Sequence, residues 1–530
     1  MHEPVNKIRI SRRWLLAVIA IVVVVLTSVT VSGVTAEQPT LDVSGLPAGL
    51  IGAAALSDLE LRVETGGEDP SPMTLTLDGQ PVNGSVVGST MVYRPRELSD
   101  GEHQFAAELP ASGPLGFLKS SRTGSRSFTV DATPPTLDID EIPAVTSYRD
   151  GVTVSGQTDG ANQLTIDGED VTLSPDGTFE ADLPHVPTNT KVVATDAAGN
   201  QTSTKISGSV TTPQIRAVHV TAHAWAHDGL RGDVLDMARR GLINAVQLDI
   251  KDEDGIVGYD SEVPLAKRSG ANAGIYDPSA ALKKLHRMDI RVIGRIVAFR
   301  DPKLAEWAWR HGHHDWVIQH PGGAPYASKY GPIAFTNFAH EKVRQYNIDL
   351  ATEAAELGFD GIMYDYIRRP DGDLSGMAFP GLDVKPHVSV ARFLKESREP
   401  VRSAGAHLSA AVFGIAATRP HEIAQDIPMM AEHVDYLSPM VYPSHWNQGE
   451  YDVANPNSQP YPIVRRSLKD FKRQVRGTEA KIIPWLQDFS LGVSYGDAQV
   501  AAQISGAADA GIDSFFLWSP SVRYHSGALG

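Results

Sequence analysis

A short run in the second half of the chain places ionisable groups at the end of a hydrophobic strand. Residues 359–370 read Phe-Asp-Gly-Ile-Met-Tyr-Asp-Tyr-Ile-Arg-Arg-Pro. Aromatic and β-branched residues favour a buried strand, where charged groups are costly unless they are paired or used in chemistry. We therefore predict a functional site here, with Asp365 as its first reactive carboxylate. The alternative is that Asp365 only forms an ion pair with a neighbouring arginine.

The elements that would position Asp365 follow Pro213, where strand-like runs begin to alternate with helical ones. One of the helical stretches, residues 341–357, repeats apolar side chains at helical spacing and stops before Gly358. Such alternation indicates a parallel sheet built from βα units. The expected strands are eight: Arg216–Trp225, Ala245–Lys251, Arg291–Phe299, Gly361–Arg368, Leu408–Ile415, Tyr436–Tyr442, Lys481–Asp488 and Ser514–Trp518.

Eight βα units in residues 213–530 predict a (β/α)₈ TIM barrel. A doubly wound open sheet is disfavoured, because no glycine-rich phosphate loop follows the first strand, where His223-Ala224-Trp225 stands. Barrel active sites lie at the C-terminal ends of the strands.

The predicted strand ends carry many polar and aromatic residues, and seven of the eight tryptophans lie in this half of the chain. Such a mouth suits sugars, whose apolar ring faces stack on indoles while carboxylates perform the bond chemistry. The predicted substrate-binding residues are Asp249, Lys251, Arg295, Tyr366, Arg368, Tyr442, His445, Trp446, Trp485, Gln487 and Trp518.

Five motifs in residues 215–525 together resemble the bacterial glycoside hydrolase domain of the DUF4015 type. They lie at residues 246–255, 294–302, 360–368, 438–446 and 484–489. This group is distantly similar to α-amylase-like barrel hydrolases, so the resemblance implies a TIM-barrel glycosidase. It also implies that Asp365 is the nucleophile, although Met363 stands where those enzymes have an arginine, a role that Arg368 could take.

Glycoside hydrolysis generally needs a second carboxyl group. The fifth predicted strand, where α-amylase-like enzymes carry their acid, ends without an acidic residue, so Asp488 is our candidate for the catalytic acid. Asp249 and Lys251 lie two residues apart in one strand and are expected to face the same way, either as a buried ion pair or as part of the site. Arg295 and Arg368 could each bind substrate or hold Asp365 ionised.

The first half of the chain has a different pattern, with no tryptophan in residues 37–212. Alternating hydrophobic runs meet at Asp78-Gly79 and again at Asp167-Gly168, which is typical of β-hairpins. We predict two β-sandwich modules, 37–132 and 133–212, separated by a hinge at Thr133-Pro134-Pro135. The second ends in a sequence similar to the last strand of bacterial Ig-like repeats. Both are expected to serve as spacers, with glycan adhesion as the alternative.

Residues 1–36 join a basic flank to an apolar run from Trp14 to Leu26, as in an export signal or a single-span membrane anchor. Either would place the rest of the protein outside the cell or on its surface. The net charge of −16 and the absence of a basic stripe exclude a nucleic-acid partner. The chain has no cysteine, and we expect no metal and no cofactor.

The sequence thus predicts an exported glycoside hydrolase that cleaves a cell-envelope or environmental polysaccharide by two-carboxylate catalysis. The alternative is a non-catalytic glycan-binding or wall-organising surface protein built on a degenerate glycosidase barrel, since fold alone does not establish activity.

Overall fold

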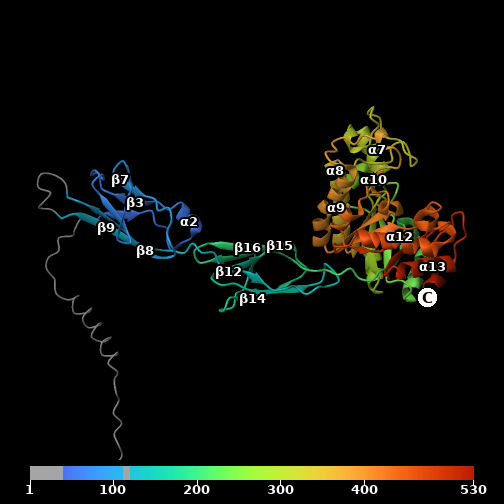
Figure 1. Cartoon of the computed structure of the whole chain (residues 1–530), viewed down its shortest axis with the longest axis horizontal. Coiled ribbons are helices and arrows are strands. Elements are labelled where there is room, and N and C mark those ends of the chain that lie inside the picture. Colours follow the sequence, from blue (N-terminus) through green and yellow to red (C-terminus); the bar gives the residue numbers. More distant parts are fainter. Residues whose placement is uncertain (1–39, 112–119) are drawn as a thin grey trace, which may run out of the picture.

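A computed structural model describes residues 40–111 and 120–530 of the chain. Two β modules precede a large α/β domain, and they follow one another along the chain as Figure 1 shows. The predicted export or anchor segment, residues 1–36, lies outside the described residues. Within the described ranges, no helix has the length and apolar character needed to cross a membrane.

The first module packs a four-stranded sheet against a five-stranded one. Both sheets contribute to one core, which includes Val63 and Phe105. A short helix, α2 (Ala53–Ser57), follows the second strand. The strands are β1 (Asp42–Ser44), β3 (Leu61–Glu64), β7 (Thr90–Tyr93) and β6 (Ser85–Val87) in one sheet, and β2 (Leu50–Ile51), β9 (Arg122–Val130), β8 (Gly101–Leu109), β4 (Thr74–Leu77) and β5 (Gln80–Val82) in the other.

The second module repeats the arrangement with a three-stranded and a four-stranded sheet around a core that includes Leu164 and Phe179. The strands are β10 (Asp138–Ile139), β11 (Val152–Gln157) and β14 (Thr178–Leu183), and β13 (Glu169–Val171), β12 (Ala161–Ile166), β15 (Thr188–Asp196) and β16 (Gln201–Ser207).

Both predicted hairpins are confirmed, one in each module. β4 pairs with β5 across Asp78-Gly79, and β12 pairs with β13 across Asp167-Gly168. In each turn the aspartate and the glycine both have positive φ, at 53° and 75° in the first and 51° and 85° in the second. This is the two-residue turn whose twist matches that of the paired strands.

The predicted parallel barrel is confirmed. Its sheet is closed, because β17 pairs with both β18 and β25 while β21 pairs with β22. Pro484 interrupts the seventh strand and divides it into two short pieces. In order the strands are β17 (Arg216–Val220), β18 (Ala245–Lys251), β19 (Arg291–Val297), β20 (Gly361–Asp365), β21 (His407–Phe413), β22 (Tyr436–Met440), β23 (Lys481–Ile482) with β24 (Trp485–Gln487), and β25 (Phe515–Trp518).

Helices connect these strands and cover the outside of the barrel. The predicted helix α8 spans Glu341–Leu357 and ends at Gly358, whose φ of 117° suits glycine. The others are α3 (Ala222–Ala226), α4 (Asp228–Arg239), α5 (Pro264–Ser269), α6 (Pro278–His286), α7 (Pro302–Arg310), α9 (Pro386–Ser403), α10 (Pro420–Ile423), α11 (Ile427–Ala431), α12 (Pro460–Gln474) and α13 (Asp497–Ala508).

Five of the predicted strands run one to three residues too far at their C-terminal ends, and the first runs five residues too far. The first strand stops at Val220 rather than continuing to Trp225, because Thr221 caps helix α3 by accepting a hydrogen bond from the Ala224 amide. Trp225 is consequently buried among the barrel's core residues and does not reach the mouth.

The second β module contacts the end of the barrel where the strands begin. The Tyr148 hydroxyl donates a hydrogen bond to Asp435 at 2.8 Å, and the Arg149 guanidinium donates to the Phe359 carbonyl at 3.0 Å. Asp435 lies one residue before β22, and Phe359 lies two residues before β20. The module therefore contacts the end of the barrel opposite to the one where the strands finish.

Candidate active site

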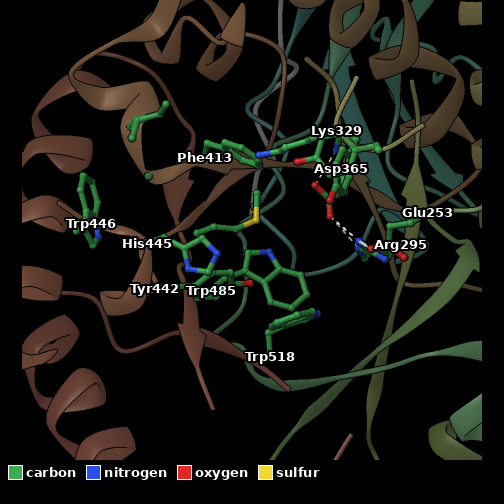
Figure 2. A pocket seen from close by; sticks show the side chains of 15 residues that line it. Glu253, Arg295, Lys329, Asp365, Phe413, Tyr442, His445, Trp446, Trp485 and Trp518 are labelled. Carbon is green, nitrogen blue, oxygen red and sulfur yellow. Dashed lines mark hydrogen bonds and ion pairs between the residues drawn. The ribbon is translucent and has the colours of Figure 1, made fainter. Parts of the chain in front are cut away.

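A cavity of about 370 Å³ opens at the C-terminal ends of the barrel strands. Eight of the predicted site residues line it: Arg295, Asp365, Tyr366, Tyr442, His445, Trp446, Trp485 and Trp518. Figure 2 shows Asp365, Arg295 and Glu253 at one end of this cavity and Trp446 at the other. The cavity therefore combines carboxylates with an aromatic wall.

Arg295 organises the polar end of the cavity. Its Nε and Nη2 atoms donate to Asp365 Oδ2 at 3.0 and 2.7 Å, and Nη2 also pairs with Glu253. Its Nη1 donates to Asp249 Oδ1 at 3.0 Å, and that same oxygen contacts His219 Nε2 at 2.9 Å. Three carboxylates thus share one buried guanidinium, which satisfies their charge inside the barrel.

Asp365 is oriented by its own strand end as well as by Arg295. The following residue, Tyr366, has a φ of 52°, which is unusual for a residue with a side chain. In this conformation the Tyr366 amide donates to Asp365 Oδ1 at 2.7 Å, while the other carboxylate oxygen binds Arg295. The strained residue therefore fixes the direction of the carboxylate, and such strain is common at functional sites.

Glu253 is the second carboxylate that lines the cavity. Burial would raise its pKa, but the charge of Arg295 and the hydrogen bond from it outweigh burial and lower the pKa to about 2. Because Glu253 and Asp365 contact the same Nη2 atom, their contacting oxygens lie within roughly 6 Å of each other by ordinary hydrogen-bond lengths. Glu253 and Asp365, rather than Asp365 and Asp488, are therefore the carboxylates that line the cavity together.

The other wall of the cavity is aromatic. The rings of Tyr442 and Trp518 stack with centroids 5.8 Å apart, and Phe489 meets Trp518 edge-on at 5.1 Å. Burial raises the pKa of Tyr442 well above its ordinary value, so its hydroxyl stays protonated. Figure 2 shows Trp485, Trp518 and His445 grouped across the cavity from Asp365. Flat rings opposite a carboxylate pair can hold the apolar face of a sugar.

Asp488 does not line the cavity. Its side chain is fully buried, and Oδ2 accepts a hydrogen bond from the His525 amide at 2.9 Å. Oδ1 contacts the imidazole of the same histidine at 2.5 Å. Burial raises the pKa of Asp488 even though His525 opposes the change. Asp488, our candidate for the catalytic acid, therefore does not share the cavity with Asp365 and instead fixes the C-terminal segment that contains His525.

The expectation that Asp249 and Lys251 face the same way is also wrong. The pairing between β18 and β19 shifts register between these two residues, so the usual alternation is broken. Asp249 points into the barrel toward Arg295, whereas Lys251 points outward to Asp301 at 2.6 Å and Asn347 at 2.9 Å. Lys251 is completely buried there and does not line the cavity.

Arg368 and Gln487 lie behind the cavity and support its walls. The Arg368 guanidinium packs 4.2 Å from the centre of the Phe413 ring and donates to the Tyr330 hydroxyl at 3.1 Å. Gln487 accepts a hydrogen bond from the Ser444 amide at 3.0 Å, next to His445. Neither side chain reaches Asp365, so Arg295 and not Arg368 is the arginine that pairs with this carboxylate.

Several residues that line the cavity were not predicted as site residues: Glu253, Lys329, Tyr330, Phe413, Gly414, Ile415 and Met440. Glu253 was visible as part of an acidic run, Asp252-Glu253-Asp254, but nothing in the sequence distinguishes it from its neighbours. Lys329 and Tyr330 belong to the long segment between α7 and α8, whose path over the mouth no periodicity reveals.

Comparison with protein-family models indicates a glycosyl hydrolase domain over the barrel. The DUF4015 family model, described as "Putative glycosyl hydrolase domain", matches residues 217–524. No curated protein matches the chain.

Solved structures with similar folds come from several bacteria. A hypothetical protein from Ruminiclostridium thermocellum is 32% identical, covers 36% of this chain and 96% of its own, and has a TM-score of 0.33. The PgaB (BpsB) glycoside hydrolase domain from Bordetella bronchiseptica is 14% identical over 58% of this chain and 95% of its own, with a TM-score of 0.44. An endo-1,4-beta-D-mannanase from Thermotoga petrophila is 13% identical over 58% of this chain and 88% of its own, with a TM-score of 0.39.

Proposed function

This chain belongs to the DUF4015 family of glycosyl hydrolase domains, and from that premise we propose that it hydrolyses glycosidic bonds in a polysaccharide of the cell envelope or the environment. The basic and apolar pattern of residues 1–36 supports export, so we place the enzyme outside the cell or on its surface.

The observation that carries this proposal is the pair of carboxylates, Asp365 and Glu253, at one end of an aromatic-lined cavity. Asp365 is the nucleophile, because two contacts from Arg295 and one from the Tyr366 amide hold its carboxylate in a fixed orientation. Glu253 is the acid and base, and Trp518 with Tyr442 supplies a stacking surface for the sugar ring.

Glu253 can serve as the acid only if it holds a proton when the substrate is bound. Its pKa of about 2 reflects two opposing effects, burial and the contact with Arg295. A sugar that excludes water from the cavity strengthens the effect of burial, which raises the pKa. Any lengthening of the Arg295 contact weakens the effect of Arg295, which lowers the pKa. Both changes raise the pKa of Glu253 toward the range of a working general acid.

The same low pKa favours a second candidate function, a glycan-binding or wall-organising protein without catalysis. If Arg295 keeps Glu253 ionised in the complex as well, the site would bind sugar but could not protonate a leaving group.

The two functions are separated by reducing-sugar release from a panel of bacterial and plant polysaccharides, measured with the full chain. We expect release by the native protein, its loss in Asp365→Asn, and native rates in Asp383→Asn, a matched change at an exposed aspartate paired with Arg392. Glycan binding without release by the native protein would instead establish the non-catalytic function.

A further inference from the structure

A second hollow, of about 280 Å³, lies beside the candidate active site and shares one residue with it. It is lined by Thr418, Arg419, Trp446, Glu450 and Tyr451, and Trp446 also lines the main cavity. In Figure 2, Trp446 lies at the end of the cavity farthest from Glu253 and Arg295. The second hollow therefore continues the main cavity on the side away from the carboxylates, and the Trp446 indole lies between the two hollows.

The shared tryptophan has an unused hydrogen-bond donor. Trp446 is only 8% exposed, and its buried indole nitrogen has no hydrogen-bond partner among the described residues. Trp446 can occupy this place because residue 414 is glycine: a Cβ there would lie 2.8 Å from Cζ2 of the indole. A buried N–H without a partner is costly, and a ligand hydroxyl would satisfy it.

The far wall of the second hollow offers both a donor and an acceptor. Arg419 pairs with Glu450 at 2.8 Å, and the second oxygen of Glu450 accepts from the Asn447 amide at 2.8 Å. Both side chains remain partly exposed, at 36% and 22%. Sugar hydroxyls donate and accept hydrogen bonds together, so an arginine–carboxylate pair suits them.

The backbone that forms this wall is strained. Tyr451 and Asp452 have φ values of 50° and 56°, although neither is glycine. The ring of Tyr451 meets the Trp446 indole edge-on at 5.3 Å, and its hydroxyl donates to Asp470 at 3.0 Å. The unusual conformation thus places an aromatic ring against the tryptophan that divides the two hollows, as expected for a binding wall.

We propose that this second hollow is a glycan subsite that holds sugar units several positions away from the bond at Asp365. The enzyme then acts on chains long enough to extend from the carboxylates past Trp446 to Arg419, and it handles short oligosaccharides poorly. This inference rests on the proposed function for its ligand class, and it adds a length requirement that the carboxylate pair alone does not impose.

The test is binding as a function of chain length, measured by isothermal titration calorimetry on the full chain carrying Asp365→Asn to prevent turnover. The probes are linear β-1,4-linked oligomers of glucose, mannose and N-acetylglucosamine, from two to eight units. We expect the affinity of the protein to rise with oligomer length. Arg419→Ala should lower the affinity for the longest bound oligomer by roughly tenfold, which corresponds to the loss of one charged hydrogen bond, and the affinity for the shortest bound oligomer by less than twofold. Glu450→Gln should also lower the affinity for the longest bound oligomer.

Arg310→Ala is the matched control, because Arg310 also forms an exposed ion pair, with Glu306, but lines neither hollow. Equal losses for short and long oligomers, or no effect of Arg419→Ala, would overturn the subsite. Polysaccharide hydrolysis without length-dependent binding would overturn it while leaving the proposed function intact. Length-dependent binding without hydrolysis by the native protein would keep the subsite and overturn the hydrolase, and the absence of both would overturn both.

Discussion

Arg295 of β19 lies directly opposite Met363 of β20, and its guanidinium reaches forward to Asp365 two residues further along the neighbouring strand. The resemblance to α-amylase-like barrel hydrolases implies an arginine at position 363. In this protein the cation that pairs with Asp365 comes from the adjacent strand, at the level of Met363.

The first prediction concerns Arg295 itself. Replacing it by Met would leave Asp249, Glu253 and Asp365 without their shared cation in a buried site. Removing one partner of a buried ion pair typically costs about 3–5 kcal/mol, so we expect a loss of that size in the free energy of unfolding at pH 7. Urea denaturation measures it, with Arg392→Met, at an exposed ion pair, as the control. A loss similar to the control's would mean that these carboxylates do not depend on Arg295.

The second prediction separates the two candidate partners of Asp365. Glu253 lines the cavity, whereas Asp488 is buried against His525. On the polysaccharide that the native protein cleaves, Glu253→Gln should lower kcat by at least a hundredfold, the usual contribution of a general acid. Asp488→Asn should lower the melting temperature and change kcat much less. The reverse result would return Asp488 to the catalytic role that the sequence suggested.

The third prediction is the stereochemical outcome. Retaining glycosidases have carboxyl groups about 5–5.5 Å apart, and inverting ones need about 6.5–9.5 Å for an intervening water. Glu253 and Asp365 contact the same nitrogen of Arg295, which fits the shorter spacing. Proton NMR of the first product formed should therefore show the anomeric configuration of the substrate. Initial release of the opposite anomer would rule out Asp365 as a nucleophile and make it a base.

The fold could be predicted because its signals are local and repeated. Asp78-Gly79 and Asp167-Gly168 encode their hairpins by turn chemistry alone, and residues 341–357 encode α8 by periodicity and a terminal glycine. The eight strands follow from alternation with helices. The end of the first strand could not be predicted, because the Thr221 side chain stops it through a hydrogen bond that hydrophobicity does not indicate.

The site could be predicted only where strand ends determine it. Asp365 and Trp518 line the cavity because they are the last residues of the parallel strands β20 and β25. Lys251 does not, since a register shift after Asp249 reverses its direction, and a bulge leaves no mark in the sequence. Glu253 was missed because it is one of three consecutive acidic residues. Only the contact with Arg295, which is distant in the chain, distinguishes it from the other two.

A fourth prediction concerns the contact between the second β module and the barrel. Arg149 donates to the carbonyls of Ala355 and Phe359, around the C-terminal end of α8, where a cation is favoured. Arg149→Ala should weaken this contact by about 1.5–3 kcal/mol, the scale of charged hydrogen bonds. We expect faster proteolytic cleavage near residues 208–215 with unchanged glycan hydrolysis by the intact chain. Arg126→Ala, an exposed arginine of the first module, is the control, and equal cleavage in both variants would contradict the predicted role.

The last prediction is a pH dependence with a defined sign. Arg295 lowers the pKa of Glu253 from its ordinary 4.5 to about 2 despite burial, so folding favours the ionised form of this carboxyl. Its contribution to stability is therefore complete above about pH 4.5 and disappears as the pH falls through about 2. Native protein should melt at a higher temperature than Glu253→Gln at pH 6 to 7, and this difference should shrink steadily below pH 4.5. Glu262→Gln, at an exposed carboxylate paired with Lys267, corrects for the loss of one negative charge. A difference between native protein and Glu253→Gln that stays constant down to pH 3 would show that Arg295 does not bind Glu253 in its ionised form.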